Sequence, residues 1–263
     1  MRFNFRSGLL FLLALTAMPI PSVRAAPFTA FGDGETLTYR VSWGIFFHAG
    51  DIVISVHEEK DASGAVVFRI TTDTSTHGFI RSFYTYNNRA EAIIDQTTGR
   101  VVLMREKGSD GKHHTDTETT FDYGRKIAHF TDHYRPGRSR DVPIPDGDPV
   151  DLISALVQTR EWNLQPGQKQ NVLVNFSDEF FPLAIYADHY EEVDTPLDTY
   201  QALMLEPRME QNPKGIFKRG GEFKVWISQK GHKLPVKMQL KLPFGSAVLL
   251  LAKYTPAAAK SGG

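Results

Sequence analysis

The sequence predicts a mainly β protein: a large antiparallel sheet curled into a barrel or half-barrel, with one amphipathic helix, at about residues 149–162, packed on it. Three observations support this prediction. From Glu35 onward, apolar and polar residues alternate with period two, as in half-buried strands. Turn residues recur at hairpin spacing, and one stretch alone has convincing helical periodicity.

The alternation is clearest in residues 36–43, where Leu37 and Tyr39 fall on one face and Thr38 and Arg40 on the other. It returns at residues 52–56 and 66–72. We therefore expect three consecutive antiparallel strands in this part of the chain.

Residues 78–84 interrupt the pattern, with four large side chains in seven positions. This composition suits a short helical or irregular corner. Strands resume at about residue 88, and turn signals then predict three further hairpin connections. These signals lie at residues 96–99, 108–111 and 122–125.

Residues 135–149, rich in Pro, Gly, Arg and Asp, read as a surface loop leading into the helix. Asp148 is placed to cap the helix and Pro149 occupies its favoured first position. Apolar residues then recur at helical spacing up to about Trp162. Six more strands bring the expected total to about a dozen; they are residues 171–176, 181–193, 201–207, 222–228, 233–242 and 246–254.

The first 25 residues have the pattern of a cleavable signal peptide. Arg2 and Arg6 precede a twelve-residue uncharged, mostly apolar run, and small residues stand at positions 23 and 25. A helix needs roughly 20 residues to cross a bilayer, so this run is too short. We expect cleavage after Ala25, export to the periplasm and, without a cysteine for lipidation, no lipid anchor. Residues 26–256 then form a single domain and residues 257–263 a flexible tail.

Charge and composition exclude several classes of function. The full chain has 30 basic and 30 acidic residues, and removal of residues 1–25 leaves 27 and 30. A net charge of −3 does not indicate the basic surface that nucleic-acid binding needs. The absence of cysteine excludes thiol nucleophiles, thiolate zinc sites, iron–sulfur clusters and disulfides.

Four stretches of the chain resemble a family of bacterial exported proteins, the domain of unknown function DUF3108. They are residues 37–44 with Ala49 and Gly50 shortly after, residues 151–156, residues 196–200, and residues 225–228 followed by 234–236 and 244–246. Asp198 stands where the family usually has glycine. The resemblance implies a β-rich envelope protein without an assigned reaction, so it provides no catalytic residues.

An enzyme would need a nucleophile beside a base, and the chain has neither a cysteine nor a Gly-x-Ser-x-Gly motif. Its short Gly-Asp-Gly and Gly-Ser-Asp-Gly segments lack the lysine or following helix of a nucleotide loop. These absences favour a non-enzymatic protein, and we assign no catalytic residue and no cofactor.

One polar cluster is a candidate metal site. If a hairpin closes at Tyr123 and Gly124, His114 lies opposite His133 and Asp116 lies near Asp132. Cross-strand neighbours about 5 Å apart could share a metal ion. The alternative, which we favour, is a pair of solvated polar strands, because closed metal sites need further ligands held by a second layer of contacts.

The large apolar side chains suggest a binding surface. Adjacent aromatics, such as Phe46 and Phe47, point to opposite faces of a strand, so one of each pair leaves the core. Barrels of moderate size can also enclose a ligand cavity. The candidate lining residues are Trp43, Phe46, Phe79, Tyr84, Trp226 and Phe244.

Three functions therefore stay open. The first is a non-enzymatic periplasmic protein that binds or shields a lipid-like or amphipathic envelope molecule in the half-barrel. The second is a structural or interaction module that contacts an envelope protein or glycan through a strand edge or aromatic pair. The third is a metal-dependent hydrolase centred on His114 and His133.

Overall fold

The computed structural model describes residues 29–213, 217, 221–242 and 245–258. The first strands are β1 (Thr36–Trp43), β2 (Phe46–Lys60), β3 (Val66–Thr76), β4 (Tyr86–Asp95), β5 (Val101–Asp110), β6 (His113–Asp122), β7 (Ile127–Asp132), β8 (Arg140–Pro143) and β9 (Pro149–Val150). The later strands are β10 (Lys169–Phe176), β11 (Glu179–Asp194), β12 (Thr199–Arg208), β13 (Glu222–Ser228), β14 (Pro235–Leu242) and β15 (Gly245–Thr255). The helical elements are α1 (Gly78–Phe83), α2 (Leu152–Gln158) and the 3-10 turns η1 (Pro136–Arg138) and η2 (Thr159–Glu161). The predicted signal peptide and most of the predicted tail lie outside the described residues.

All fifteen strands belong to one sheet, in the order β8-β7-β6-β5-β4-β3-β2-β1-β15-β14-β13-β12-β11-β10-β9. Neighbouring strands are antiparallel, apart from the parallel pair β9 and β10. The first and last strands lie side by side in the middle of the sheet, with Thr36 opposite Thr255. The mainly β fold predicted from the sequence is confirmed.

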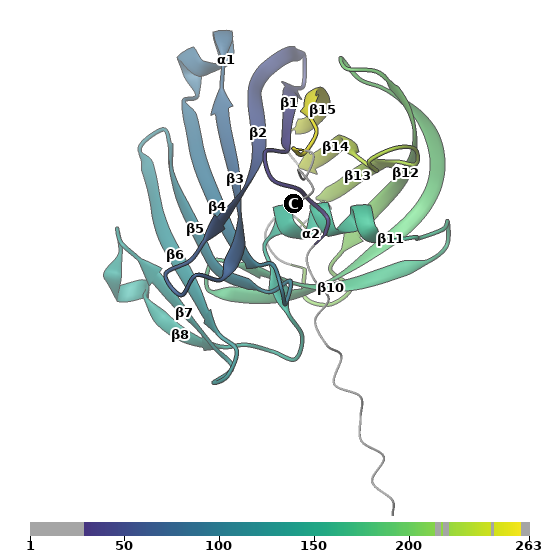
Figure 1. The fold of residues 1–263 in the computed structure, drawn as a ribbon. Helices are drawn as coiled ribbons and strands as arrows, with labels where there is room; N and C mark the ends of the chain where they lie inside the picture. The colour runs from purple at the N-terminus through teal and green to yellow at the C-terminus, as the bar shows by residue number, and fades with distance from the viewer. Residues whose placement is uncertain (1–28, 214–216, 218–220, 243–244, 259–263) are drawn as a thin grey trace, which may run out of the picture.

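The sheet curls without closing. Its edges are β8 on one side and β9 with β10 on the other, and β8 and β9 are consecutive in the chain. Figure 1 shows the sheet wrapped around α2, with β3 to β8 as one wall and β11 to β14 as the other. The protein is therefore a half-barrel, and we call the gap between β8 and β10 the seam.

Helix α2 fills much of the interior. Its buried residues Ala155 and Leu156 face an apolar wall formed by β11, β12 and β13. The void left between helix and wall is only about 20 Å³, which is the close packing expected of a protein core. The wall residues are Leu183, Ile185, Leu205, Pro207, Phe223 and Val225.

The helix begins three residues later than predicted. Asp151, not Asp148, is the cap, because its carboxylate accepts hydrogen bonds from the backbone N–H groups of Ile153 and Ser154 at 2.8 and 3.0 Å. The carboxylate of Asp148 instead pairs with Arg100 at 2.8 Å. Pro149 belongs to β9, where it lies opposite Leu173 of β10.

The segment predicted as a surface loop also contains regular structure. Residues 136–138 form η1 and residues 140–143 form β8, which pairs with β7. Because β8 is the edge of the sheet, its polar, exposed residues and its proline are compatible with a strand.

A buried ion pair joins the end of the helical segment to the sheet. Arg160 of η2 contacts Glu35, just before β1, at 2.9 Å, and the two side chains are 8% and 3% exposed. The facing atoms, Nη1 of Arg160 and Oε1 of Glu35, have no other hydrogen-bond partner among the described residues. Arg160 also lies over the ring of Phe31. Burial beside the Glu35 carboxylate raises the pKa of Tyr254 to about 12.

Removing one partner of this pair should destabilise the protein. Arg160→Ala leaves the Glu35 carboxylate buried without its counter-charge, and such changes cost about 3–5 kcal/mol in the free energy of unfolding. Urea unfolding followed by circular dichroism measures this loss. The control is Arg89→Ala, since the Arg89–Asp73 pair is mostly exposed and should contribute less than about 1 kcal/mol. Equal losses in the two variants would contradict the assignment of Arg160 as an anchor.

Candidate functional site

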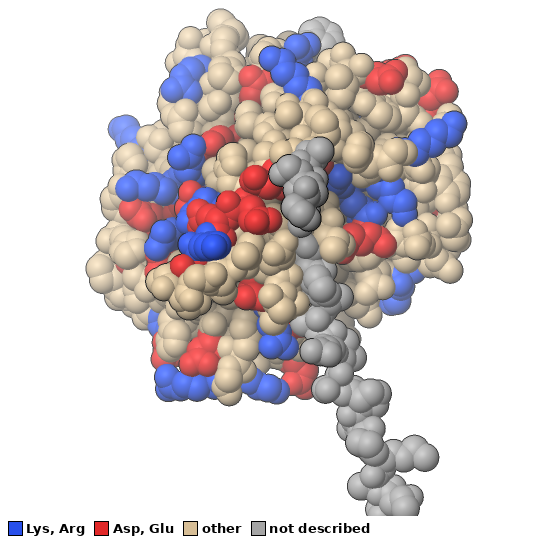
Figure 2. Space-filling view, viewed as in Figure 1, with Lys and Arg blue, Asp and Glu red and all other residues tan. Residues whose placement is uncertain are grey.

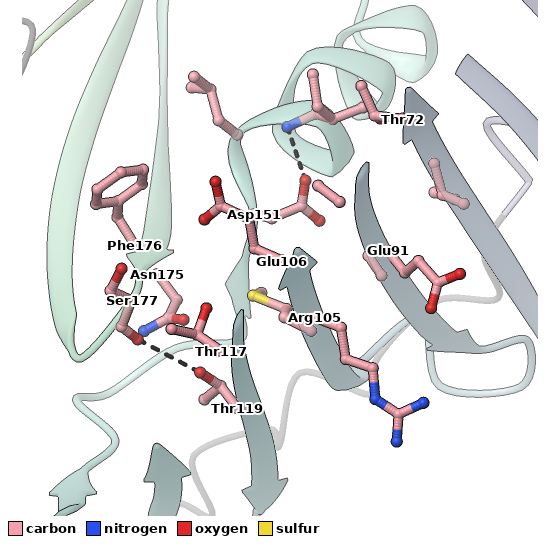
Figure 3. Close-up of a pocket in the computed structure, with 16 residues that line it drawn as sticks. Thr72, Glu91, Arg105, Glu106, Thr117, Thr119, Asp151, Asn175, Phe176 and Ser177 are labelled. Atoms are coloured by element: carbon pink, nitrogen blue, oxygen red, sulfur yellow. Dashed lines mark hydrogen bonds between the residues drawn. The ribbon is translucent and has the colours of Figure 1, made fainter. Parts of the chain in front are cut away.

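A small cavity lies just inside the seam, between the inner face of β3 to β6, the start of α2 and the end of β10. Its volume is about 180 Å³. Figure 3 shows its polar side chains facing the space, whereas Glu91 and Arg105 point away from it. The apolar lining residues are Ile70, Ala90, Ala92, Met104, Leu152, Ile153 and Phe176. The polar ones that face the space are Thr72, Glu106, Thr117, Thr119, Asp151, Asn175 and Ser177.

Side-chain contacts hold the seam at this point. The hydroxyl of Thr119 on β6 donates to the carbonyl of Ser177, which follows β10, at 3.4 Å (Figure 3). Arg140 of β8 forms an ion pair with Asp178 at 2.7 Å. The two edges of the sheet are thus joined by side chains where a closed barrel would have a backbone ladder.

The size of this cavity decides what it can hold. Pockets for drug-sized ligands usually measure about 300–1,000 Å³, and a cavity of about 150 Å³ holds benzene. At about 180 Å³, the seam cavity suits a small group and is too small to enclose an extended acyl chain.

The predicted aromatic residues separate into different places. Phe46, Phe79 and Tyr84 gather at one end of the sheet, where the β1–β2 turn and α1 project (Figure 1). The rings of Phe46 and Phe79 stack with centroids 6.1 Å apart, and those of Phe79 and Phe83 meet edge to face at 4.6 Å. We call this surface the apolar tip; it comprises Ile45, Phe46, Phe79, Phe83 and Tyr84.

Most of the apolar tip is open to solvent. Ile45 is 83% exposed, Phe79 65%, Phe83 75% and Tyr84 46%, and no residue of α1 is buried. Single exposed apolar residues are ordinary, but a contiguous exposed group marks an interaction surface.

The remaining predicted lining residues do not face the interior together. Val225 and Ile227 border cavities beneath the helical segment, so Trp226 between them points to the outer face of the sheet. There its indole N–H donates to Glu191 and Lys237 lies 4.1 Å above its ring. Trp43 packs over Gly245, where an added Cβ would lie 3.1 Å from the ring. Phe244 lies outside the described residues.

Beneath the apolar tip, Asp51 lies between two histidines. His48 Nε2 and His77 Nε2 are 2.9 and 3.2 Å from its carboxylate oxygens. Ser75 Oγ is 3.1 Å from the same Nε2 atom of His77. A hydrolytic triad needs the serine and the carboxylate on different ring nitrogens, so the described geometry is not that of a triad.

Three of the candidate metal residues lie on β6 and β7, His133 directly follows β7, and the register of the two strands differs from the predicted one. Thr117 lies opposite Asp132, because the turn spans residues 123–126, with Lys126 at a φ of 53°. The ring of His114 contacts Tyr134, while the backbone N–H of His133 donates to the carbonyl of Asp116. No group of three or more metal-ligating side chains occurs in the described part of the chain.

Asp132 is buried, with its side chain 1% exposed, and has cationic partners. Its carboxylate accepts from the backbone N–H groups of Tyr134 and Arg135 at 3.1 and 2.8 Å. Arg135 and Arg138 face it at 3.1 and 3.7 Å. Burial raises the pKa of this carboxyl. The backbone hydrogen bonds and the two guanidinium groups together lower the pKa by more than burial raises it, so the pKa lies below the ordinary value.

The surface carries charges of both signs. Figure 2 shows acidic and basic side chains interspersed on the face turned to the viewer. No helix of the described ranges is both long and apolar enough to cross a membrane.

Comparison with known proteins establishes the family. The model of the family described as "Protein of unknown function (DUF3108)" matches residues 38–252. The chain belongs to the DUF3108 family. Among solved structures, this DUF3108 protein is similar to a "Beta-barrel-like Protein of Domain of Unknown Function DUF1849 from Brucella abortus", with a TM-score of 0.56 and 8% identity. That similarity covers 88% of this chain and 100% of the other, and it supports the fold alone. Comparison with curated proteins finds no match.

Ile45 was not predicted from the sequence, and Phe83 is an aromatic of the same cluster that is not among the six candidate lining residues. A usable signal was present, because Ile45 follows Gly44, which has a φ of 56° at the β1–β2 turn. A large apolar residue at the point of a tight turn has little chance of being covered by its own sheet.

Asp132→Asn should lower stability in a pH-dependent way. The folded-state pKa is lowered, so the stabilisation is present above the unfolded pKa of about 3.9 and is lost as the pH falls through the folded value. Urea midpoints should differ clearly between the parent and Asp132→Asn at pH 7 and converge below about pH 4. Asp188→Asn, at a 58% exposed carboxylate, is the control. If the difference in urea midpoint between the parent and Asp132→Asn stays constant with pH, the ionised Asp132 carboxylate does not stabilise the fold as described.

Proposed function

We propose that this protein is a non-enzymatic, exported envelope protein that binds lipid-like or amphipathic molecules on the surface of its apolar tip. The observation that supports the proposal most directly is the contiguous exposure of Ile45, Phe79 and Phe83 at one end of the sheet. In this proposal the ligand is contacted from outside and is not enclosed by the half-barrel.

The volumes favour the apolar tip over the interior. Helix α2 leaves about 20 Å³ against the β11–β13 wall, and the seam cavity measures about 180 Å³. Neither space suits an acyl chain. Burying a Phe or Ile side chain that is otherwise exposed contributes roughly 1.5–3 kcal/mol, so several such residues provide a useful binding energy.

Charged side chains of both signs lie around the apolar tip. Arg81 of α1 donates to the carbonyl of Thr76 and the side chain of Asn87, and Lys112 lies in the turn whose Gly111 N–H donates to Thr85. Asp51 and Asp110 supply two opposing negative charges nearby. This mixture of signs supports a contact governed by apolar burial rather than by attraction to one sign of charge.

Two substitutions test the proposal. The parent protein should co-sediment with vesicles of phosphatidylethanolamine and phosphatidylglycerol, and Phe79→Ser/Phe83→Ser should bind at least about tenfold more weakly, because each ring contributes roughly 1.5–3 kcal/mol when buried. Added salt should change the parent's binding little, because burial of apolar side chains governs the proposed contact.

Leu197→Ser is the matched control for this experiment. Leu197 is 42% exposed and lies in the turn between β11 and β12 at the opposite end of the sheet. All three substituted side chains are exposed, so the variants should unfold at the parent's temperature. Equal vesicle binding by the parent and Phe79→Ser/Phe83→Ser, or no binding by the parent, would refute the proposal.

A further inference from the structure

A second concave surface lies at the end of the half-barrel away from the apolar tip. It is a groove of about 370 Å³ between the β8–β9 loop, the end of the α2–η2 segment and the outer edge of β10. Its volume is about twice that of the seam cavity, which measures about 180 Å³. We call it the Trp162 groove; its polar and aromatic lining residues are Asp146, Asp148, Gln158, Trp162, Gln170 and Asn171.

The indole of Trp162 is a fixed wall of this groove. Its ring is half-buried and packs against the core, and it also borders a neighbouring polar cavity of about 80 Å³. The backbone on either side is held, because the N–H of Trp162 donates to Thr159 at 3.3 Å and Lys233 Nζ donates to its carbonyl at 3.2 Å. Trp162 therefore presents an aromatic surface in a constrained position.

Three amide side chains line the same groove as this ring. Those of Gln158, Gln170 and Asn171 line the groove, and none of them forms a side-chain hydrogen bond within the described residues. Each amide offers two N–H donors and a carbonyl acceptor. The groove thus combines an aromatic surface with several uncommitted donors and acceptors.

Each carboxylate that lines the groove has a cationic partner. Asp146 pairs with Lys126 at 2.9 Å and Asp148 pairs with Arg100 at 2.8 Å. No other charged side chain lines the groove in the described part of the chain. A ligand here is expected to be neutral, since the groove offers no unpaired charge for an anion or a cation.

The neighbouring strand edge favours a small polar ligand over an extended peptide. Strand β9 already pairs with β10 at Leu173 and Val174, which leaves the edge from Lys169 to Val172 for a new strand. A typical strand has about 5–6 residues, so this edge is short for strand addition.

From these features we propose that the Trp162 groove binds a neutral saccharide. Saccharide rings have an apolar C–H face, which would lie on the indole. Their hydroxyl groups both donate and accept, which matches the amides of Gln158, Gln170 and Asn171. This binding site is separate from the apolar tip: β1 runs from Thr36, beside the Glu35–Arg160 pair, to Trp43 at the tip, a length of about 25 Å.

The experiment is calorimetric titration of the full-length exported protein with chitotetraose, cellotetraose and maltotetraose. At least one of these oligosaccharides should bind. Gln170→Ala/Asn171→Ala should weaken that binding by about tenfold, because it removes two hydrogen-bonding side chains. Both residues are exposed, so this variant should fold normally. Trp162→Ala should abolish binding, and Trp162→Phe should retain part of it.

Two controls separate this proposal from its alternatives. Gln201→Ala changes an exposed amide outside the groove and should bind the oligosaccharide as the parent does. Phe79→Ser/Phe83→Ser should also bind it normally, whatever the outcome of the vesicle experiment. Failure of all three oligosaccharides to bind at millimolar concentration, or binding that Gln170→Ala/Asn171→Ala leaves unchanged, would overturn the proposal. So would an extended peptide that occupies the groove in place of the saccharides.

Discussion

The buried ion pair between Glu35 and Arg160 anchors the helical segment to the sheet. Each charge is costly to bury alone, so the pair ties the end of the α2–η2 segment to the residue that precedes β1. Helix α2 in turn covers the apolar inner wall of β11, β12 and β13. Without this cover, a curled and unclosed sheet would expose a large apolar surface to water.

A filled interior has a consequence for where function can lie. Helix α2 and the side chains of both walls occupy the half-barrel. The Trp162 groove and the apolar tip therefore lie at its two ends. The apolar tip is built from turns at one end, and the Trp162 groove is built around the helix terminus at the other. The sheet therefore separates the apolar tip from the Trp162 groove by the length of β1, roughly 25 Å.

Period-two alternation was sufficient to predict most strands, because a strand with one buried face places apolar residues toward the core and polar residues toward solvent in turn. The helix start was less predictable, since Asp148 and Asp151 both fit a cap and a tertiary contact with Arg100 decides between them. The β6–β7 register depended on the length of one turn, and a turn of four residues placed Thr117, not Asp116, opposite Asp132. Alternation also predicts that Phe46 and Phe47 point to opposite faces of the strand. It does not say what covers either face, so the exposure of the apolar tip could be learned only from the structure.

The position of the sheet's gap also bears on how the chain folds. Almost every strand pairs with its neighbour in sequence, so the segments before and after the gap can each form as a local meander. The pairing of β1 with β15 is different, because it joins Thr36 to Thr255 across most of the chain. Contacts of such high sequence separation form slowly. The two meanders should therefore be largely assembled before they join, and until they join, β1 and β15 each present an unpaired edge to which another copy could bind.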